Sequence, residues 1–232
     1  MASAWNVTYD KIQTGNSLVN QRLDMTNKLK MTNARSPAHK RDTKRPTARE
    51  RIFNTAGRLF YTKGIRAVGV DTIAAQADTT KMSLYRNFSS KDELVAEWLR
   101  DHDTQFWQTW DATMALHPDD PRGQLKAAFA LLQKHVVDPE TRGCPMANAA
   151  VELTESGHPA RKVIEAHKAR LRARLTKMCT QMGARSPGLL ADQLYLLMEG
   201  AQITIQTLGL RGPAKNAARA AEMLIAAHMR AT

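Results

Sequence analysis

The sequence of residues 70–94 is VDTIAAQADTTKMSLYRNFSSKDEL, and this stretch decides the fold. It contains two short helical patterns, separated by a tight turn at Asp78 and Thr79. Asp tolerates the left-handed backbone that such a turn requires. Thr80 is suited to capping the second helix, which we expect to end near Phe88. A short turn before such a helix is typical of the helix-turn-helix, a DNA-binding unit.

The residues on either side supply two more helix starts. Thr47 and Glu50 have the spacing of a capping box, and apolar residues at helical spacing then predict a helix over 47–63 that ends at Gly64. Ser90 and Glu93 form a second capping box, which predicts the start of a long helix. The second of the three head helices has only Gly69 as a weaker N-cap.

The helix over 80–88 has two different faces. At 100 degrees per residue, Leu84 and Phe88 point to one side, while Met82 and Arg86 point to the opposite side. Arg86 is suited to guanine O6 and N7, and Met82 to a thymine methyl group. The alternative is an amphipathic helix with an ordinary solvated face.

Four further side chains are placed to reach the DNA backbone. Ser83 and Tyr85 flank the exposed face of that helix, and Lys81 and Lys91 each lie in the first turn of a helix. Hydroxyl groups and ammonium groups at such positions contact phosphate oxygens. We therefore expect them to position the protein on the duplex.

The stretch over residues 47–95 resembles the DNA-binding domain of the tetracycline-repressor-like (TetR) family, through Leu84-Tyr85, Phe88 and the Lys91-Asp-Glu-Leu94 segment. Asp78 stands where the family usually has a turn glycine, and Gly69 where a Ser or Thr usually caps the second helix. The resemblance implies a bacterial transcription regulator. The expected DNA-binding residues are Thr47, Thr80, Lys81, Met82, Ser83, Tyr85, Arg86 and Lys91.

The positive charge of the chain lies mostly at its N-terminal end. The 232 residues have a formal net charge of +12, of which residues 1–45 carry +6, residues 46–92 carry +4 and residues 93–232 carry +2. A basic end on a nearly neutral body favours a nucleic-acid partner over a membrane surface. We expect a disordered basic arm (1–45), a helix-turn-helix domain (46–92) and an effector-binding and dimerisation domain (93–232).

The arm over residues 1–45 has two interpretations. It lies against DNA phosphates or enters the minor groove, as basic arms can, or it is a solvated tail. Met25 and Met31 are also plausible alternative start positions, so the native protein need not contain residues 1–30.

The remaining sequence predicts helices throughout, with apolar residues at helical spacing over 122–137, 160–183, 190–208 and 217–228 and a short helix that opens at Cys144 and Pro145. We therefore expect an all-α fold of about nine helices. The longest apolar stretches are too short to cross a bilayer, so we expect no membrane partner. Two cysteines make no disulfide framework or metal-ligand cluster, which favours the cytoplasm and predicts no cofactor and no metal site.

The resemblance implies a homodimer formed by the last two long helices. Their apolar stripes fit a four-helix interface between two copies, or alternatively the core of one copy. The residues expected at the interface are Leu190, Leu194, Leu197, Ala201, Ile205, Leu224 and His228.

We expect the helices between the DNA-binding domain and the last two helices to form an effector pocket. Aromatic residues gather on the helix that joins the DNA-binding domain, and other apolar residues are placed to face them, although such a stripe also fits a plain core. The expected pocket residues are Trp98, Phe106, Trp110, Phe129, Cys144, Met146, His167 and Met178.

Three other functions stay open at this point. Cys144 is the expected N-cap of a helix near Arg142, which suits a thiol-based redox or electrophile sensor. An enzyme would use His158, Glu165 and His167, or the Asp101-His102-Asp103 cluster, but neither set has a recognised catalytic spacing. The third is a non-specific architectural DNA-binding protein. The leading interpretation is a sequence-specific DNA-binding regulator and not an enzyme: a repressor that an unknown small molecule releases from a palindromic operator.

Overall fold

The computed structural model describes residues 45–209 and 212–229. These residues form nine α-helices and one short 3-10 helix, and no strand occurs among them. The expected all-α fold is therefore confirmed. The expected arm lies outside the described residues except for Arg45.

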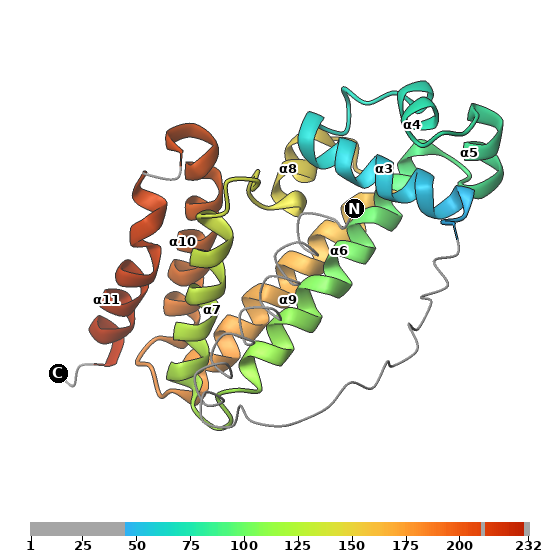
Figure 1. Cartoon of the computed structure of the whole chain (residues 1–232). Helices are drawn as coiled ribbons and strands as arrows, with labels where there is room; N and C mark the ends of the chain where they lie inside the picture. Colours follow the sequence, from blue (N-terminus) through green and yellow to red (C-terminus); the bar gives the residue numbers. More distant parts are fainter. Residues whose placement is uncertain (1–44, 210–211, 230–232) are drawn as a thin grey trace, which may run out of the picture.

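Three helices form the head of the molecule: α3 (Ala48–Lys63), α4 (Val70–Gln76) and α5 (Lys81–Asn87). The capping box at the start of α3 forms as predicted, because Thr47 Oγ1 accepts from the Glu50 amide and Glu50 Oε2 accepts from the Thr47 amide. Asp78 has a φ of 52°, the left-handed conformation that the turn before α5 requires. Figure 1 shows the three helices at one end of the molecule.

Helix α6 (Lys91–Met114) leads from the head into the body. Ser90 Oγ accepts from the Glu93 amide at 3.0 Å, so the predicted cap forms. The Glu93 carboxylate pairs with Arg100. No return bond from it to the Ser90 amide is present, so only half of the predicted capping box is observed.

The body contains α7 (Pro121–Val136), α8 (Pro145–Glu152), α9 (Pro159–Gln181), α10 (Pro187–Leu208), the 3-10 helix η1 (Pro213–Asn216) and α11 (Ala217–Met229). Helix α9 packs against α6 on one side and α10 on the other, while α11 packs on α10 and α7. Figure 1 shows α6 and α9 running side by side, with α10 and α11 at the end of the body away from α5.

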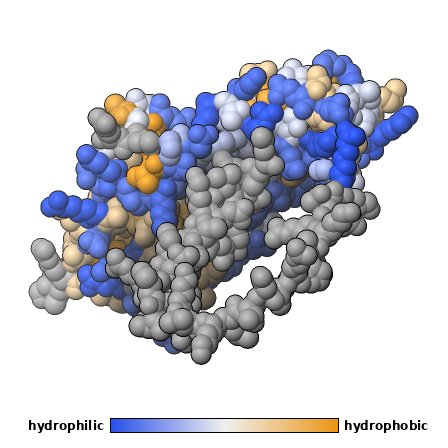
Figure 2. All heavy atoms as spheres, in the orientation of Figure 1, coloured by the Kyte–Doolittle hydropathy of each residue, from blue (hydrophilic) through white to orange (hydrophobic). Residues whose placement is uncertain are grey.

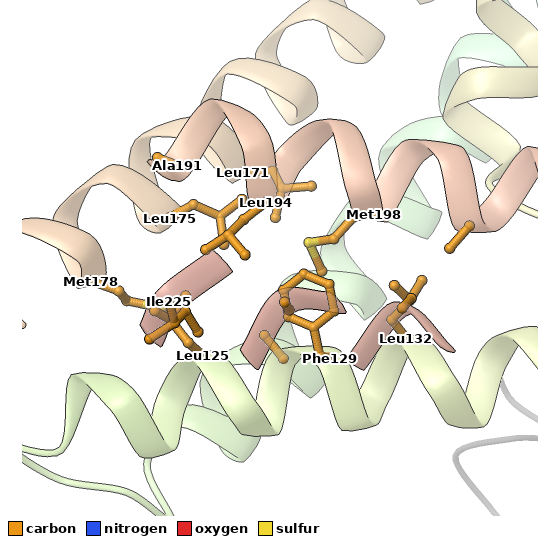
Figure 3. Close-up of a cluster of buried hydrophobic side chains, with 14 of the residues drawn as sticks. Leu125, Phe129, Leu132, Leu171, Leu175, Met178, Ala191, Leu194, Met198 and Ile225 are labelled. Atoms are coloured by element: carbon orange, nitrogen blue, oxygen red, sulfur yellow. The ribbon is translucent and has the colours of Figure 1, made fainter. Parts of the chain in front are cut away.

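The described residues form two hydrophobic cores. The body core joins apolar side chains of α7, α9, α10 and α11, among them Leu125, Phe129, Leu175 and Leu194 (Figure 3). The head core continues past residue 92 into α8 and the start of α9, where Met146 and Ile164 belong to it. The head therefore does not pack as a separate unit, because α8 contributes to its core.

Candidate DNA-binding surface and effector cavity

Helix α5 presents one face to solvent and buries the other, as its periodicity predicts. Leu84 and Phe88 are buried, whereas Met82 is 65% exposed and Tyr85 is 46% exposed. Arg86 is also exposed. A large apolar side chain beside a free guanidinium on one exposed helix face is suited to reading base edges in a major groove.

The start of α5 is held by its cap. Thr80 Oγ1 accepts from the Ser83 amide at 3.1 Å. Lys81 pairs with Asp71 at 3.2 Å, and both side chains are more than half exposed. Exposed pairs of this kind stabilise a protein little, so a phosphate can replace Asp71 as the partner of Lys81.

Lys91 lies inward instead of reaching outward. Its Nζ donates to the carbonyl oxygen of Ile65 at 2.7 Å, and burial lowers its pKa. In this structure the side chain ties the start of α6 to the segment after α3. Sequence periodicity placed it in a first helical turn but carried no information about this carbonyl.

Arg51 has a structural role that its place in the sequence does not predict. Its guanidinium donates to the carbonyl oxygens of Ala77 and Asp78 at 3.0 Å each, and to that of Pro46 at 3.1 Å. It thereby fixes the turn before α5 against α3. An arginine on the polar side of a predicted helix gives no signal of such long-range contacts.

A cavity of about 50 Å³ lies between α6, α7, α9 and α10, with the start of α8 beside it. Its apolar wall includes Leu132, Leu171 and Met198, which come from three helices and are seen together in Figure 3. Four of the eight expected pocket residues line it: Phe106, Trp110, Cys144 and His167.

The other four expected pocket residues lie elsewhere. Phe129 and Met178 belong to the body core, and Met146 belongs to the head core. Trp98 also lies in the head core, against Phe60, with ring centroids 5.7 Å apart. None of the four is in the wall of the cavity. Periodicity identifies residues that face inward but does not say where a cavity interrupts the packing.

An ion pair lies in the cavity wall. Lys168 Nζ donates to both oxygens of Glu199, at 2.6 and 2.7 Å, and lies 3.5 Å from Cys144 Sγ. Burial lowers the pKa of Lys168, but Cys144 and Glu199 outweigh burial and raise it overall. Lys168 therefore stays charged, and Glu199 neutralises it. Neither residue belongs to a motif or an apolar stripe of the sequence.

Three histidines line the same cavity. Burial lowers the pKa of His102 to about 3, and burial also lowers the pKa of His135 and of His167. His167 Nδ1 lies 2.6 Å from Asp103 Oδ1. This carboxylate raises the pKa of His167, but less than burial lowers it. All three rings are therefore neutral at pH 7.

Most of the expected interface residues are buried within one copy. Leu190, Leu194, Ala201 and Ile205 belong to the body core and are at most 7% exposed. This corrects the expected interface, because a side chain buried in its own chain offers no surface to a partner. Leu197 and Leu224 are partly buried and pack on that core, and His228 Nε2 lies 3.0 Å from Gln193 Oε1.

Other residues of the same helices form an exposed apolar surface. Leu189, Leu196 and Ile203 of α10 are 54–68% exposed and are spaced seven residues apart, which puts them on one face. Helix α11 exposes Met223 to 68%. These four residues are the α10–α11 surface. Figure 2 shows hydrophobic atoms in orange at the α10–α11 end of the molecule.

Polar contacts connect the cavity with the head. Tyr61 of α3 donates to the Gly143 carbonyl, next to Cys144, at 3.1 Å. The Arg66 amide donates to Glu152 of α8 at 2.9 Å, and the Arg66 guanidinium pairs with Glu155 at 2.7 Å. Cys144 itself lines the cavity and belongs to the head core. These contacts tie α8 and the loop before it to α3 and the segment after it.

Of the residues considered for an enzyme, His167 and Asp103 are paired, whereas His158 has a structural role. His158 caps α9 through Nδ1, and its Nε2 lies 3.4 Å from Asp92. Within the described ranges, no group of three or more His, Cys, Asp or Glu side chains is arranged to hold a metal ion. No helix among the described residues is long and apolar enough to span a membrane.

A helix-turn-helix head on a helical body with an internal cavity defines a DNA-binding transcription regulator. Residues 52–98 match the family model described as "Bacterial regulatory proteins, tetR family". The chain therefore has the DNA-binding domain of this family, on a fold like that of TetR-family regulators.

Solved structures extend the likeness beyond the head. A TetR-family transcriptional regulator from Streptomyces coelicolor is 28% identical, with a TM-score of 0.75, over 79% of this chain and 96% of that one. A regulator from Streptomyces avermitilis is also 28% identical, with a TM-score of 0.69, over 79% and 98%. A regulator from Saccharomonospora viridis, solved with choline, is 22% identical, with a TM-score of 0.65, over 77% and 95%. No curated protein matches the chain significantly.

Proposed function

We propose that this protein is a homodimeric repressor that binds a palindromic operator and is released by a small molecule in the cavity. The observation that carries the proposal is the exposed face of α5, where Met82, Tyr85 and Arg86 stand out from a helix whose other side is buried. Arg86 reads a guanine, Met82 contacts a thymine methyl group, and Tyr85 contacts a phosphate.

The cap of α5 and its neighbours position the head on the duplex. Thr80, Lys81 and Ser83 contact phosphates at the start of α5, and Thr47 does so at the start of α3, where N-terminal amides also favour an anion. Lys91 leaves the Ile65 carbonyl when a phosphate approaches. The arm over residues 1–45 adds sequence-independent attraction through its charge.

The α10–α11 surface carries the dimer. Helices that expose leucine and isoleucine at a spacing of seven residues pack against a second copy to form a four-helix interface. A two-fold axis through this interface presents two α5 helices to two half-sites. A palindromic operator follows from that symmetry.

The cavity controls the distance between the two heads. A ligand that enters a cavity of about 50 Å³ pushes α6, α7, α9 or α10 outward. Because α6 continues into the head and α8 holds Arg66 in the segment after α3, the two α5 helices change their spacing. The effector thus binds one of two conformations more tightly and shifts the equilibrium between them.

Selection of duplexes from a random pool by the full-length protein tests the function. The proposal expects one palindrome to be enriched, with specific affinity at least about a thousandfold above random duplexes. Equal affinity for all duplexes, with the same dependence on salt, would instead indicate an architectural DNA-binding protein. A compound that stabilises the protein but leaves operator affinity unchanged would contradict the release mechanism.

A second function, thiol-based sensing, is favoured by the surroundings of Cys144. Its sulfur lies 3.5 Å from Lys168 Nζ, so a group added to the sulfur would displace Lys168 from Glu199. The thiol is only 7% exposed, so a reagent must enter the cavity to reach it. Cys144→Ser separates the two functions: a thiol sensor loses its release by electrophiles, whereas a non-covalent effector still releases the operator.

A further inference from the structure

A residue of the cavity wall carries an unused hydrogen-bond donor. Trp110 lines the cavity and is 2% exposed, and its Nε1 has no hydrogen-bond partner among the described residues. Buried indole N–H groups normally find an acceptor, because an unmatched one loses its bond to water. Trp107 provides the contrast, since its Nε1 donates to Asp103 Oδ1 at 2.7 Å.

The wall beside this donor is aromatic. Phe106 stacks on Trp110 with ring centroids 5.8 Å apart and an interplanar angle of 28°, and its ring meets His167 edge to face at 4.8 Å. Flat rings stacked in this way accept a further planar group in the same arrangement. The cavity therefore favours a planar, unsaturated ligand.

The charges of the wall cancel. Lys168 and Glu199 neutralise each other at 2.6 Å, and the three histidines are neutral at pH 7. An anionic ligand must compete with Glu199 for Lys168, and a cationic ligand must compete with Lys168 for Glu199. Either exchange leaves one charge of the pair buried without its partner, which is strongly unfavourable.

The volume of the cavity limits the size of the ligand. About 50 Å³ is a third of the roughly 150 Å³ cavity that accepts benzene in another protein. A ligand with one ring fits only if a wall side chain moves, and Met198 is suited to this because methionine is flexible and unbranched. A ligand of several rings would need much larger movements.

We infer that the effector is a small, uncharged, planar unsaturated molecule, with at most one ring, whose oxygen accepts a hydrogen bond from Trp110 Nε1. Aromatic ketones and aldehydes belong to this class. The inference rests on the proposed function, since it names the chemistry of the effector. It differs from choline, the cation bound to the Saccharomonospora viridis regulator.

Four probes of nearly equal size test the class. Acetophenone is neutral with an acceptor oxygen, isopropylbenzene is neutral without one, benzoate is an anion and benzamidinium is a cation. Calorimetry with the full-length protein should rank acetophenone first and isopropylbenzene about tenfold weaker, with no measurable binding of the two ions. Tighter binding of either ion, or binding of none of the four, would overturn the inference.

Trp110→Phe tests the donor itself. The variant keeps an aromatic ring but removes the N–H group, so the preference for acetophenone over isopropylbenzene should fall from about tenfold to about onefold. Trp107→Phe is the matched control, because it removes an indole outside the cavity wall, and it should retain the preference. An unchanged preference in Trp110→Phe would refute the role of the donor.

Operator release, measured with the same probes on the selected duplex, separates this inference from the proposed function. Release by acetophenone and not by the ions supports both. Binding of acetophenone without release contradicts the effector mechanism but supports the chemistry of the cavity. Release by benzoate or benzamidinium alone supports the mechanism and overturns the ligand class.

Discussion

At the scale of single residues, burial separates the α5 side chains that belong to the core from those that reach solvent. Leu84 is fully buried and Met82 is 65% exposed, although the two are only two positions apart. Periodicity alone predicts this separation, and the left-handed Asp78 agrees with the tolerance of Asp for that backbone in a tight turn. It does not predict that Lys91 turns inward to the Ile65 carbonyl, because that contact joins segments 26 positions apart.

We expect Arg86→Ala to weaken binding to the selected palindrome by about 1–3 kcal/mol, or about 5- to 150-fold, and to relax the preference at one base position. The reason is the loss of the bidentate contact to guanine. Fluorescence anisotropy with duplexes that differ at each position measures both effects. Lys81→Ala is the control, which should weaken all duplexes alike and reduce the salt slope by about one. A uniform loss for Arg86→Ala would contradict base reading.

His102 makes stability depend on pH. Its pKa is about 3 in the folded protein and 6.5 ordinarily, so below pH 6.5 the unfolded chain gains a proton that the folded chain does not. This one group lowers the free energy of unfolding by about 1.4 kcal/mol per pH unit from pH 6.5 towards 3. Urea denaturation at pH 6.5, 5.5 and 4.5 should give a shallower pH dependence for His102→Gln. Equal slopes for the two proteins would show that His102 is not kept neutral.

At the scale of helices, close approach limits which side chains are allowed. A Cβ atom on Gly57 of α3 would lie 2.7 Å from Cδ1 of the Trp98 ring in α6. The sequence predicts both helices and their caps, but it gives no sign that they meet at a glycine. The expectation that Trp98 lines the pocket is wrong for the same reason. The sequence predicts the helix that carries Trp98, but it does not predict that the ring packs against Gly57 in the head core.

We expect Gly57→Ala to destabilise the protein by about 1–2 kcal/mol, because overpacking against a rigid ring outweighs the better helix propensity of alanine. Urea denaturation measures the difference. Gly188→Ala in α10 is the control, since a Cβ atom there meets nothing within 4 Å, and it should be neutral or slightly stabilising. Stabilisation by Gly57→Ala would contradict the close contact of α3 with α6.

At the scale of the whole molecule, the apolar stripes of the last two helices serve two purposes. Leu190 and Leu194 fill the body core, while Leu189 and Leu196 are exposed one or two positions away. A sequence pattern shows that such a helix is unusually apolar. It does not distinguish the apolar side that packs on its own chain from the apolar side that faces a second copy. That is why the helices were predicted well and the interface residues were not.

We expect the double variant Leu196→Glu and Ile203→Glu to be monomeric, because two charges on the α10–α11 surface would face each other across the two-fold axis. Analytical ultracentrifugation measures the oligomeric state, and binding to the palindrome should fall at least about 100-fold. Leu116→Glu is the control: Leu116 is 76% exposed in the loop between α6 and α7 and should not affect assembly. A dimeric double variant would place the interface elsewhere.

The proposed function requires that two α5 helices of one dimer read a specific palindrome. The most direct test compares the affinity of the full-length protein for the selected palindrome, for its single half-site and for a scrambled duplex of equal length at one salt concentration. The account predicts that the palindrome binds at least about a thousandfold more tightly than the scrambled duplex, with the half-site in between. Equal affinity for all three duplexes would contradict it.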